Sequence, residues 1–215
     1  RNLEVEEMLE QVLFFSRMLH EEDKRVSNVV FMGMGEPFLN YDHTLKAIGY
    51  INEDLGIGAR HISVSTSGVI KGIERLSNEK MQINLAVSLH APNDKLRSEL
   101  MPINKKFPLR DLLKSVDKYI VKTGRRVMFE YLMIKGVNDS PAQASQLAGL
   151  MKKPLYMVNL IAYNPTDVFK PTDKKAIEDF KTILEQEGVG VTQRYSFGAD
   201  IDAACGQLAN KNNCK

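Results

Sequence analysis

Cysteine and tryptophan are the residues that this sequence most clearly lacks, since it has two cysteines, Cys205 and Cys214, and no tryptophan. Two thiols are too few for a secreted scaffold held by disulfides, and too few for a cysteine-rich metal site made within this chain. We therefore expect a cytoplasmic protein. No stretch approaches about 18 uncharged apolar residues, so no transmembrane helix is expected.

A large excess of one charge is also absent. The 29 Lys and Arg residues nearly balance the 27 Asp and Glu residues, which leaves a formal net charge of +2. This mildly basic balance permits binding of nucleic acid but does not require it. With 43% hydrophobic and 26% charged residues, the composition is that of an ordinary globular domain, which excludes a disordered or fibrous chain.

The length of 215 residues suits one large α/β domain. The chain opens on Arg1-Asn2-Leu3-Glu4, which is neither a start methionine nor a signal peptide. We therefore expect it to begin inside a longer protein.

Two kinds of apolar pattern alternate along the chain. Helical spacing predicts helices at 5–19, 45–51, 70–76, 109–121, 141–151 and 176–186, and short apolar or β-branched runs predict strands at 28–32, 61–65, 83–87, 127–132, 158–162 and 191–195. This alternation is typical of parallel strands joined by crossover helices. Because the chain opens on a helix, we predict an incomplete α/β barrel whose first strand is missing in front of Arg1. The longest irregular stretches are 91–108 and 163–171.

Ligand-binding segments are expected where the strands end, because the active site of a parallel barrel lies at the carboxyl ends of its strands. Polar or glycine-rich residues follow the predicted strands at 33–37, 65–68, 88–90, 135–138, 163–165 and 198–206. Any single segment of this kind is more often an ordinary polar loop, so the hypothesis depends on several of them together.

The most informative segment is Gly33-Met34-Gly35-Glu36-Pro37. Two glycines let a ligand approach the backbone closely, and the carboxylate beside them can bind an ammonium group. The alternative is a glycine-rich turn with a solvated Glu36. Cys205 lies in a loop among glycine and aspartate residues, where it is either a catalytic thiol or a small buried side chain. His90 is either a ligand contact or a structural histidine.

Six motifs carry a resemblance: Gly33-Met34-Gly35-Glu36-Pro37, Ser88-Leu89-His90-Ala91, Leu100-Met101-Pro102-Ile103-Asn104, Gly136-Val137-Asn138-Asp139, Val158-Asn159-Leu160-Ile161 with Tyr163-Asn164-Pro165, and Asp200-Ile201-Asp202-Ala203-Ala204-Cys205-Gly206-Gln207-Leu208. Together they closely resemble the RlmN/Cfr family of radical S-adenosylmethionine (SAM) enzymes, which methylate an adenine ring carbon in RNA. The last motif is the most specific, and the resemblance covers residues 1–209.

The resemblance implies the radical SAM fold, an incomplete (β/α)6 partial TIM barrel with parallel strands and, in this chain, no first strand. In that family a Cys-x3-Cys-x2-Cys loop, which holds a four-iron, four-sulfur cluster, would lie just upstream of Arg1. Residues 1–209 would then form the C-terminal part of the radical SAM core, and 210–215 a tail. Because the cluster ligands are absent from this chain, we expect the fragment alone to be inactive.

The resemblance also assigns the SAM contacts residue by residue. Gly35 and Glu36 would hold the methionyl amino group of SAM. The remaining contacts would come from Ser67, Ser88, Leu89, His90 and Asn164. No residue of this chain is expected to bind a metal.

Cys205 would be the catalytic residue. A first SAM would methylate its sulfur, and a radical from a second SAM, cleaved at the cluster, would take a hydrogen from that methyl group. The resulting methylene radical would add to C2 of an adenine in 23S ribosomal RNA, and also in tRNA. Such a cofactor radical is needed because the ring carbon is electron-poor. The resolving cysteine and the general base of the family have no match in this chain.

The target adenine must be unpaired or flipped out to reach a barrel mouth, with its backbone held by basic residues. The candidates are Arg97, Lys105, Lys106, Arg125, Arg126, Lys135 and Arg194. We expect a monomer that does not bind membranes. Two alternatives stay open, an adenine C8-methyltransferase of the Cfr branch, which gives antibiotic resistance, and a non-catalytic RNA-binding module that has lost the cluster.

Overall fold

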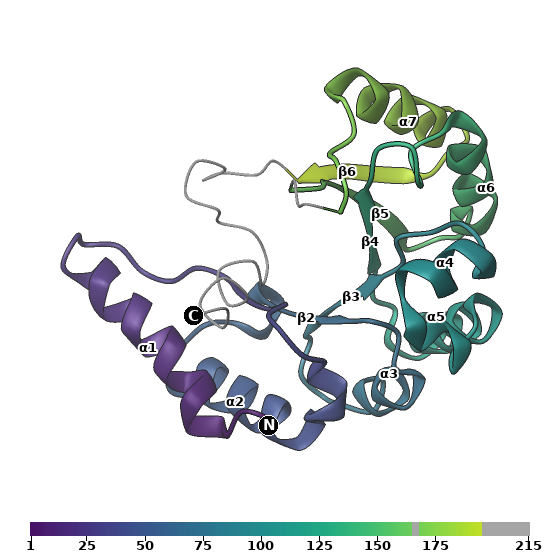
Figure 1. Ribbon diagram of the computed structural model, residues 1–215. Helices are drawn as coiled ribbons and strands as arrows, with labels where there is room; N and C mark the ends of the chain where they lie inside the picture. The colour runs from purple at the N-terminus through teal and green to yellow at the C-terminus, as the bar shows by residue number, and fades with distance from the viewer. Residues whose placement is uncertain (165–167, 195–215) are drawn as a thin grey trace.

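The computed structural model describes residues 1–164 and 168–194 (Figure 1). Its strands form one six-stranded sheet in the order β1-β2-β3-β4-β5-β6, and all neighbouring strands are parallel. The strands are β1 (Val29–Phe31), β2 (Ile62–Thr66), β3 (Asn84–Ser88), β4 (Val127–Met133), β5 (Tyr156–Ala162) and β6 (Gly190–Arg194). The α-helices are α1 (Val5–His20), α2 (Tyr41–Glu53), α3 (Ile70–Leu76), α4 (Asp94–Leu100), α5 (Leu109–Thr123), α6 (Pro141–Met151) and α7 (Lys174–Gln186).

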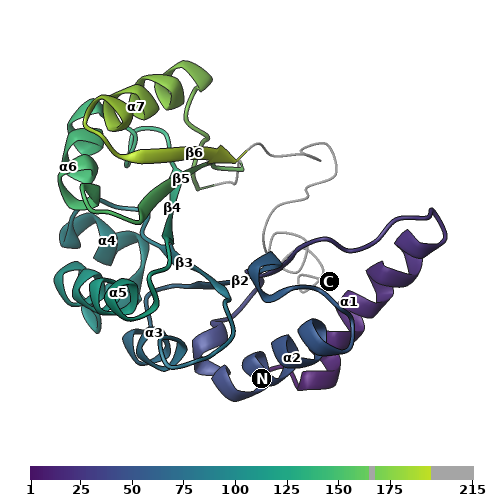
Figure 2. The same cartoon turned by 180° about the vertical axis from the view of Figure 1, so that it is seen from behind.

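The sheet is strongly curved, and helices α2 to α7 cover its convex side, while α1 lies beyond β1 (Figures 1 and 2). Long side chains meet across its open side, where the Nη1 of Arg194 in β6 lies 3.6 Å from the Sδ of Met32, next to β1. Nevertheless β1 and β6 do not pair in the described part of the chain, so the sheet stays open. The prediction of an incomplete parallel α/β barrel is confirmed.

The core fills the space between the sheet and the outer helices. In β4, Phe129 and Tyr131 are fully buried on this side of the sheet. The Phe129 ring lies 4.7 Å from that of Tyr156 in β5, and the Tyr131 ring lies 5.4 Å from that of Phe180 in α7. Since successive strand residues face opposite sides, their neighbours Met128, Glu130 and Leu132 face the concave side.

The prediction that 91–108 is irregular is wrong, because this stretch contains α4 and a 3-10 turn at Pro102–Lys105. Asn93 caps α4 by accepting a hydrogen bond from the N–H of Leu96 at 3.0 Å. The buried residue of this helix is an arginine, Arg97, so the apolar periodicity that marks other helices is missing. The remaining bounds shift by a few residues; the helix expected at 45–51, for example, begins at Tyr41.

In residues 1–164 and 168–194, no helix has the length and apolar character needed to cross a membrane. The proposed boundary between core and tail at residue 209 lies outside the described residues, so that division stays a prediction.

Candidate cofactor site

The Glu36 carboxylate joins the loops that follow β1 and β2. Its Oε2 accepts hydrogen bonds from the N–H of Ser67 at 2.7 Å and from the Ser67 hydroxyl at 2.6 Å. Its Oε1 accepts a hydrogen bond from the N–H of Phe38 at 3.0 Å. The alternative of a solvated Glu36 is therefore wrong, because the side chain is half-buried and held in one orientation by three donors.

Gly35, directly before Glu36, leaves its backbone open to a ligand. Its φ of 100° lies in a region that other residues rarely adopt, and no atom lies within 4 Å of the place that a Cβ would take. A ligand can therefore reach the N–H and C=O groups of this loop without meeting a side chain.

Arg97 lies fully buried beneath the ends of β2 and β3. Its guanidinium donates hydrogen bonds to the carbonyls of Ser67 at 2.7 Å, Ser88 at 3.0 Å and Leu89 at 3.2 Å. It also donates to the Oδ1 of Asn104 at 2.8 Å. Arg97 therefore fixes the spacing between two neighbouring strand ends.

The buried setting of Arg97 overturns one prediction. Burial lowers the pKa of its guanidinium to about 10, against the opposing influence of the Asp94 charge, so it remains charged at neutral pH. Because the side chain is 0% exposed, it cannot contact RNA, and the prediction that Arg97 binds RNA is wrong. The role of Arg97 is structural. It donates to the carbonyl of Ser67, whose N–H donates to Glu36, so the backbone of Ser67 is held on both sides.

His90 follows β3 in a left-handed backbone conformation, with φ of 58°. Its Nδ1 accepts a hydrogen bond from the N–H of Leu132 at 3.1 Å, so the proton of the neutral ring lies on Nε2. The side chain of Asn138 holds the His90 carbonyl at 2.9 Å. Burial, together with the charge of Arg97, lowers the pKa of His90 to about 4. At neutral pH the ring is therefore uncharged and offers Nε2–H as a donor.

We expect His90 to make the fold less stable in acid. The folded protein binds a proton at His90 only near pH 4, whereas an unfolded chain binds it near about pH 6.5, so stability falls as the pH drops through this window. His90→Asn should lose less stability than the wild type between about pH 7.5 and about pH 5, because Asn tolerates the left-handed backbone and does not titrate. Urea midpoints at both pH values test this. His20→Asn, at an exposed helix end, should behave like the wild type, and an equal loss in His90→Asn would contradict the expectation.

The other residues that were predicted to contact SAM differ in how far they are exposed to a ligand. Leu89 is fully buried, so it can contact a ligand only through its backbone. Ser88 is half-buried at the end of β3, and Asn164 is half-buried just beyond the end of β5. Cys205 lies outside the described residues. Hydrogen bonds through Glu36 and Arg97 link Gly35–Glu36, Ser67 and Ser88–His90, and Asn164 lies at the same edge of the sheet.

The remaining basic candidates fall into two groups. Arg125 and Arg126 precede β4, at the amino ends of the strands, and Arg125 donates to Asn84 at 2.9 Å. These two lie at the opposite edge of the sheet from the strand-end site, and their contact with the RNA backbone stays a prediction. The others lie at the carboxyl side of the sheet and are exposed: Lys105, Lys106, Lys135 and Arg194.

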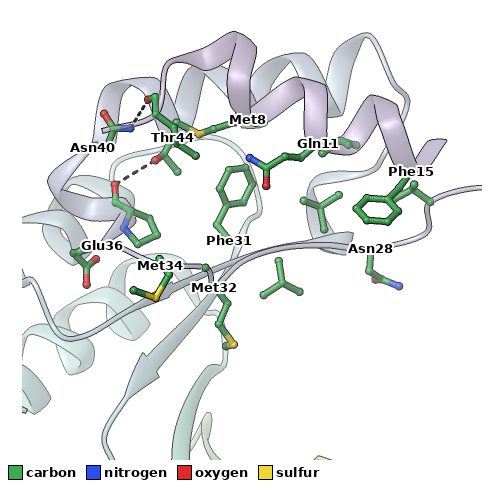
Figure 3. A pocket seen from close by; sticks show the side chains of 18 of the residues that line it. Met8, Gln11, Phe15, Asn28, Phe31, Met32, Met34, Glu36, Asn40 and Thr44 are labelled. Carbon is green, nitrogen blue, oxygen red and sulfur yellow. Dashed lines mark hydrogen bonds between the residues drawn. The ribbon is translucent and has the colours of Figure 1, made fainter. Parts of the chain in front are cut away.

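A cavity of about 620 Å³ opens between α1 and β1 (Figure 3). Its walls carry apolar side chains such as Phe15 and Phe31, and Gly35 and Glu36 line one end. Ser67, Ser88 and His90 are not among its lining residues. The cavity therefore meets the strand-end site only at the loop after β1 and runs along the unpaired side of that strand.

Two buried amides that support the site were not predicted from the sequence. Asn104 accepts from Arg97 and donates to Asp94 Oδ1 at 2.9 Å. Asn138 is fully buried, and besides His90 it binds the N–H of Ile134 at 2.7 Å. Both residues belong to motifs that carry the family resemblance, but nothing in the sequence indicated that they are buried.

Three features define the class of this protein: the open parallel barrel, Glu36 directly after Gly35, and the polar groups at the strand ends. A family model described as the Radical SAM superfamily matches residues 1–147. The match covers more than half of the chain, and the chain belongs to the radical SAM superfamily.

The most similar relatives found are more particular. A protein of Dictyoglomus thermophilum, described as a probable dual-specificity RNA methyltransferase RlmN, is 48% identical over 97% of this chain and 61% of its own length. A protein of Bacillus licheniformis with the same description is 51% identical over 98% of this chain and 60% of its own length. The chain thus spans about three fifths of the curated relatives that it matches, and the RlmN/Cfr resemblance is confirmed.

Solved structures agree with this grouping. A radical SAM methyltransferase from Sphaerobacter thermophilus has 47% identity and a TM-score of 0.93, with 96% of this chain and 62% of that chain covered. SuiB from Streptococcus suis, solved with bound S-adenosylmethionine, has 15% identity and a TM-score of 0.63 over 96% of this chain, which shows the fold alone.

Membership of the superfamily implies two cofactors, SAM and a four-iron, four-sulfur cluster. The strand ends fit SAM, because open backbone at Gly35, serine hydroxyls and the Nε2–H of His90 are polar groups of the kind that orient a small ligand. The residues do not fit the cluster. In the described part of the chain no group of three or more His, Cys, Asp or Glu could hold a metal, and the full sequence has two cysteines.

Proposed function

We propose that this chain is the SAM-binding core of a radical SAM enzyme that methylates C2 of an adenine in RNA, with 23S ribosomal RNA and tRNA as substrates. The observation that carries the proposal is the hydrogen-bonded set formed by Glu36, Ser67, Arg97 and the end of β3. It joins three of the segments expected to contact SAM at one edge of the sheet. The identity to relatives described as RlmN supports the RNA substrate.

Each of these residues has a role in the proposal. SAM supplies the methyl group and the radical chemistry that an electron-poor ring carbon requires. Glu36 orients Ser67, and the Ser67 oxygen and the Gly35 carbonyl would accept hydrogen bonds from the methionyl ammonium group. His90 offers Nε2–H to the rest of the cofactor. The Cys205 thiolate would accept a methyl group from SAM, with S-adenosylhomocysteine as the leaving group.

The RNA backbone would meet exposed cations on the same side of the sheet. Lys105 and Lys106 follow α4, Lys135 follows β4, and Arg194 ends β6. Cations in these positions attract phosphates and position the strand without reading its sequence. We place the enzyme, as a monomer, in the cytoplasm with its ribosomal substrate.

The test is a methylation reaction that contains the full-length protein with a reconstituted iron–sulfur cluster, SAM, a reductant and unmodified ribosomal RNA. Mass spectrometry of the digested nucleosides separates 2-methyladenosine from 8-methyladenosine. We expect 2-methyladenosine. The 8-methyl product would assign the chain to the Cfr branch. Binding of RNA by the protein without any cluster or methylation would favour the non-catalytic RNA-binding module.

A further inference from the structure

Four cations gather at the amino edge of the sheet, opposite to the strand-end site. Arg60 lies in the turn before β2, and Arg125 and Arg126 directly precede β4. Lys122 lies in the last turn of α5, the helix that leads into β4. Because β2 pairs with β3 and β3 with β4, the starts of these strands lie side by side. We call these four residues the amino-edge patch.

Each member of the amino-edge patch is held by an uncharged partner. The contacts run from the cation to an amide oxygen or a thioether sulfur: Arg60 Nε to Gln82 Oε1 at 2.7 Å, Arg125 Nη2 to Asn84 Oδ1 at 2.9 Å, Arg126 Nη1 to Met157 Sδ at 4.0 Å, and Lys122 Nζ to Asn78 Oδ1. Such a partner orients the side chain but leaves its positive charge uncompensated.

Several other exposed cations of this chain pair with carboxylates instead. Three examples are the pairs Arg75 with Asp42, Lys152 with Glu187, and Lys181 with Glu185. In residues 1–164 and 168–194, no Asp or Glu oxygen lies within 4.0 Å of a nitrogen of the amino-edge patch. The patch therefore keeps a local excess of positive charge, although the chain as a whole is almost neutral.

The shape of the amino-edge patch favours an extended anion. The starts of β2 and β4 are two strand spacings apart, about 10 Å, so one small anion cannot reach both. Arg60, Lys122 and Arg126 are exposed, and Arg125 is half-buried, so solvent-facing donors remain along this length. Guanidinium and ammonium groups bind phosphate oxygens well, and a nucleic-acid backbone presents phosphates at regular intervals.

We propose that the amino-edge patch binds the phosphate backbone of the RNA substrate, at a segment away from the target adenine. Strand β4 has seven residues, so the patch lies about 20 Å from the strand-end site. A different part of the RNA must therefore meet it than the part that meets the cations beside the strand ends. Contacts of this kind position an RNA without reading its sequence. The inference rests on the proposed function, which supplies RNA as the substrate.

The experiment measures how the affinity for RNA depends on salt. The full-length protein is titrated with a fragment of 23S ribosomal RNA that holds the target loop and its flanking helices. The test variant combines Arg60→Gln, Lys122→Gln and Arg126→Gln, and glutamine keeps a donor but carries no charge. The slope of log affinity against log salt should become shallower by about 2, because each phosphate contact contributes about 0.7–0.9. Binding at about 0.1 M salt should weaken about 10- to 100-fold.

The matched control removes the same charge from cations that are paired with carboxylates, in the triple variant Arg75→Gln, Lys152→Gln and Lys181→Gln. It should keep the wild-type slope to within about 0.5. A second arm uses a short single-stranded RNA with the target adenine and a few neighbours, which the wild type and the test variant should bind alike.

Three results would overturn the inference: equal slopes for the wild type and the test variant, equal losses in the test and control variants, or an equal loss on the short RNA. The second would assign the effect to net charge, and the third to the strand-end site. Failure of the wild type to bind either RNA would instead contradict the proposed function itself.

Discussion

Replacing Arg97 with methionine should lower the free energy of unfolding by about 3–5 kcal/mol. Methionine fills a similar volume but offers no donors, so the carbonyls of Ser67, Ser88 and Leu89 and the amide oxygen of Asn104 lose their partners. A buried group left unpaired costs about 1–3 kcal/mol, and several such groups share this site. The loss is a large part of the about 5–15 kcal/mol that a typical domain has.

Urea unfolding of the wild type and Arg97→Met measures this loss directly. The matched control is Arg110→Met, because Arg110 is an exposed arginine on the neighbouring helix α5. Its substitution should change the free energy of unfolding by less than about 0.5 kcal/mol. A loss in Arg97→Met as small as that of the control would show that the strand ends do not depend on this guanidinium.

In the full-length protein, Cys205→Ala should abolish RNA methylation while leaving the iron content and the fold intact. The reason is chemical, because a thiolate that carries the methyl group in a covalent intermediate cannot be replaced by a methyl side chain. Methyl transfer to unmodified ribosomal RNA, measured together with iron content, tests this. Cys214→Ala is the matched control and should retain wild-type activity, because Cys214 falls outside the motif that carries the resemblance.

Activity of Cys205→Ala close to that of the wild type would rule out the S-methylcysteine mechanism. Cys205 would then return to the alternative interpretation of a small buried side chain. Loss of activity in both cysteine variants would instead indicate a general effect of thiol removal and would also contradict the assignment of Cys205 alone.

The strands of this fold were predictable because each is an apolar or β-branched run. Ile62–Thr66 and Asn84–Ser88, for example, lie within a residue of the strands expected at 61–65 and 83–87. Helix α4 was not predictable by the same pattern, because its buried face carries Arg97 in place of apolar residues. A periodic pattern of apolar residues predicts a helix only when the residues that the helix buries are apolar.

The sequence predicted where the site lies, but it did not predict the hydrogen bonds that join its residues. Glu36, which follows Gly35, was expected to bind a ligand directly, and the structure shows its carboxylate accepting hydrogen bonds from Ser67 and Phe38. Arg97 was expected on an RNA-binding surface because a basic residue is usually exposed. Its burial depends on carbonyl groups from two other loops, which no local pattern reveals.

The most direct test of the central claim, that SAM binds at the ends of β1 to β3, is an amide NMR titration of the isotope-labelled protein with excess SAM. We expect chemical-shift changes concentrated at six positions: Gly35, Glu36, Ser67, Ser88, Leu89 and His90. Amides on the outer helices, such as those of α6, should stay unchanged. Shifts confined to α1 and β1, at cavity residues such as Phe15 and Phe31, or no shifts at Ser67 and Ser88 at saturating SAM, would contradict SAM binding at the strand ends.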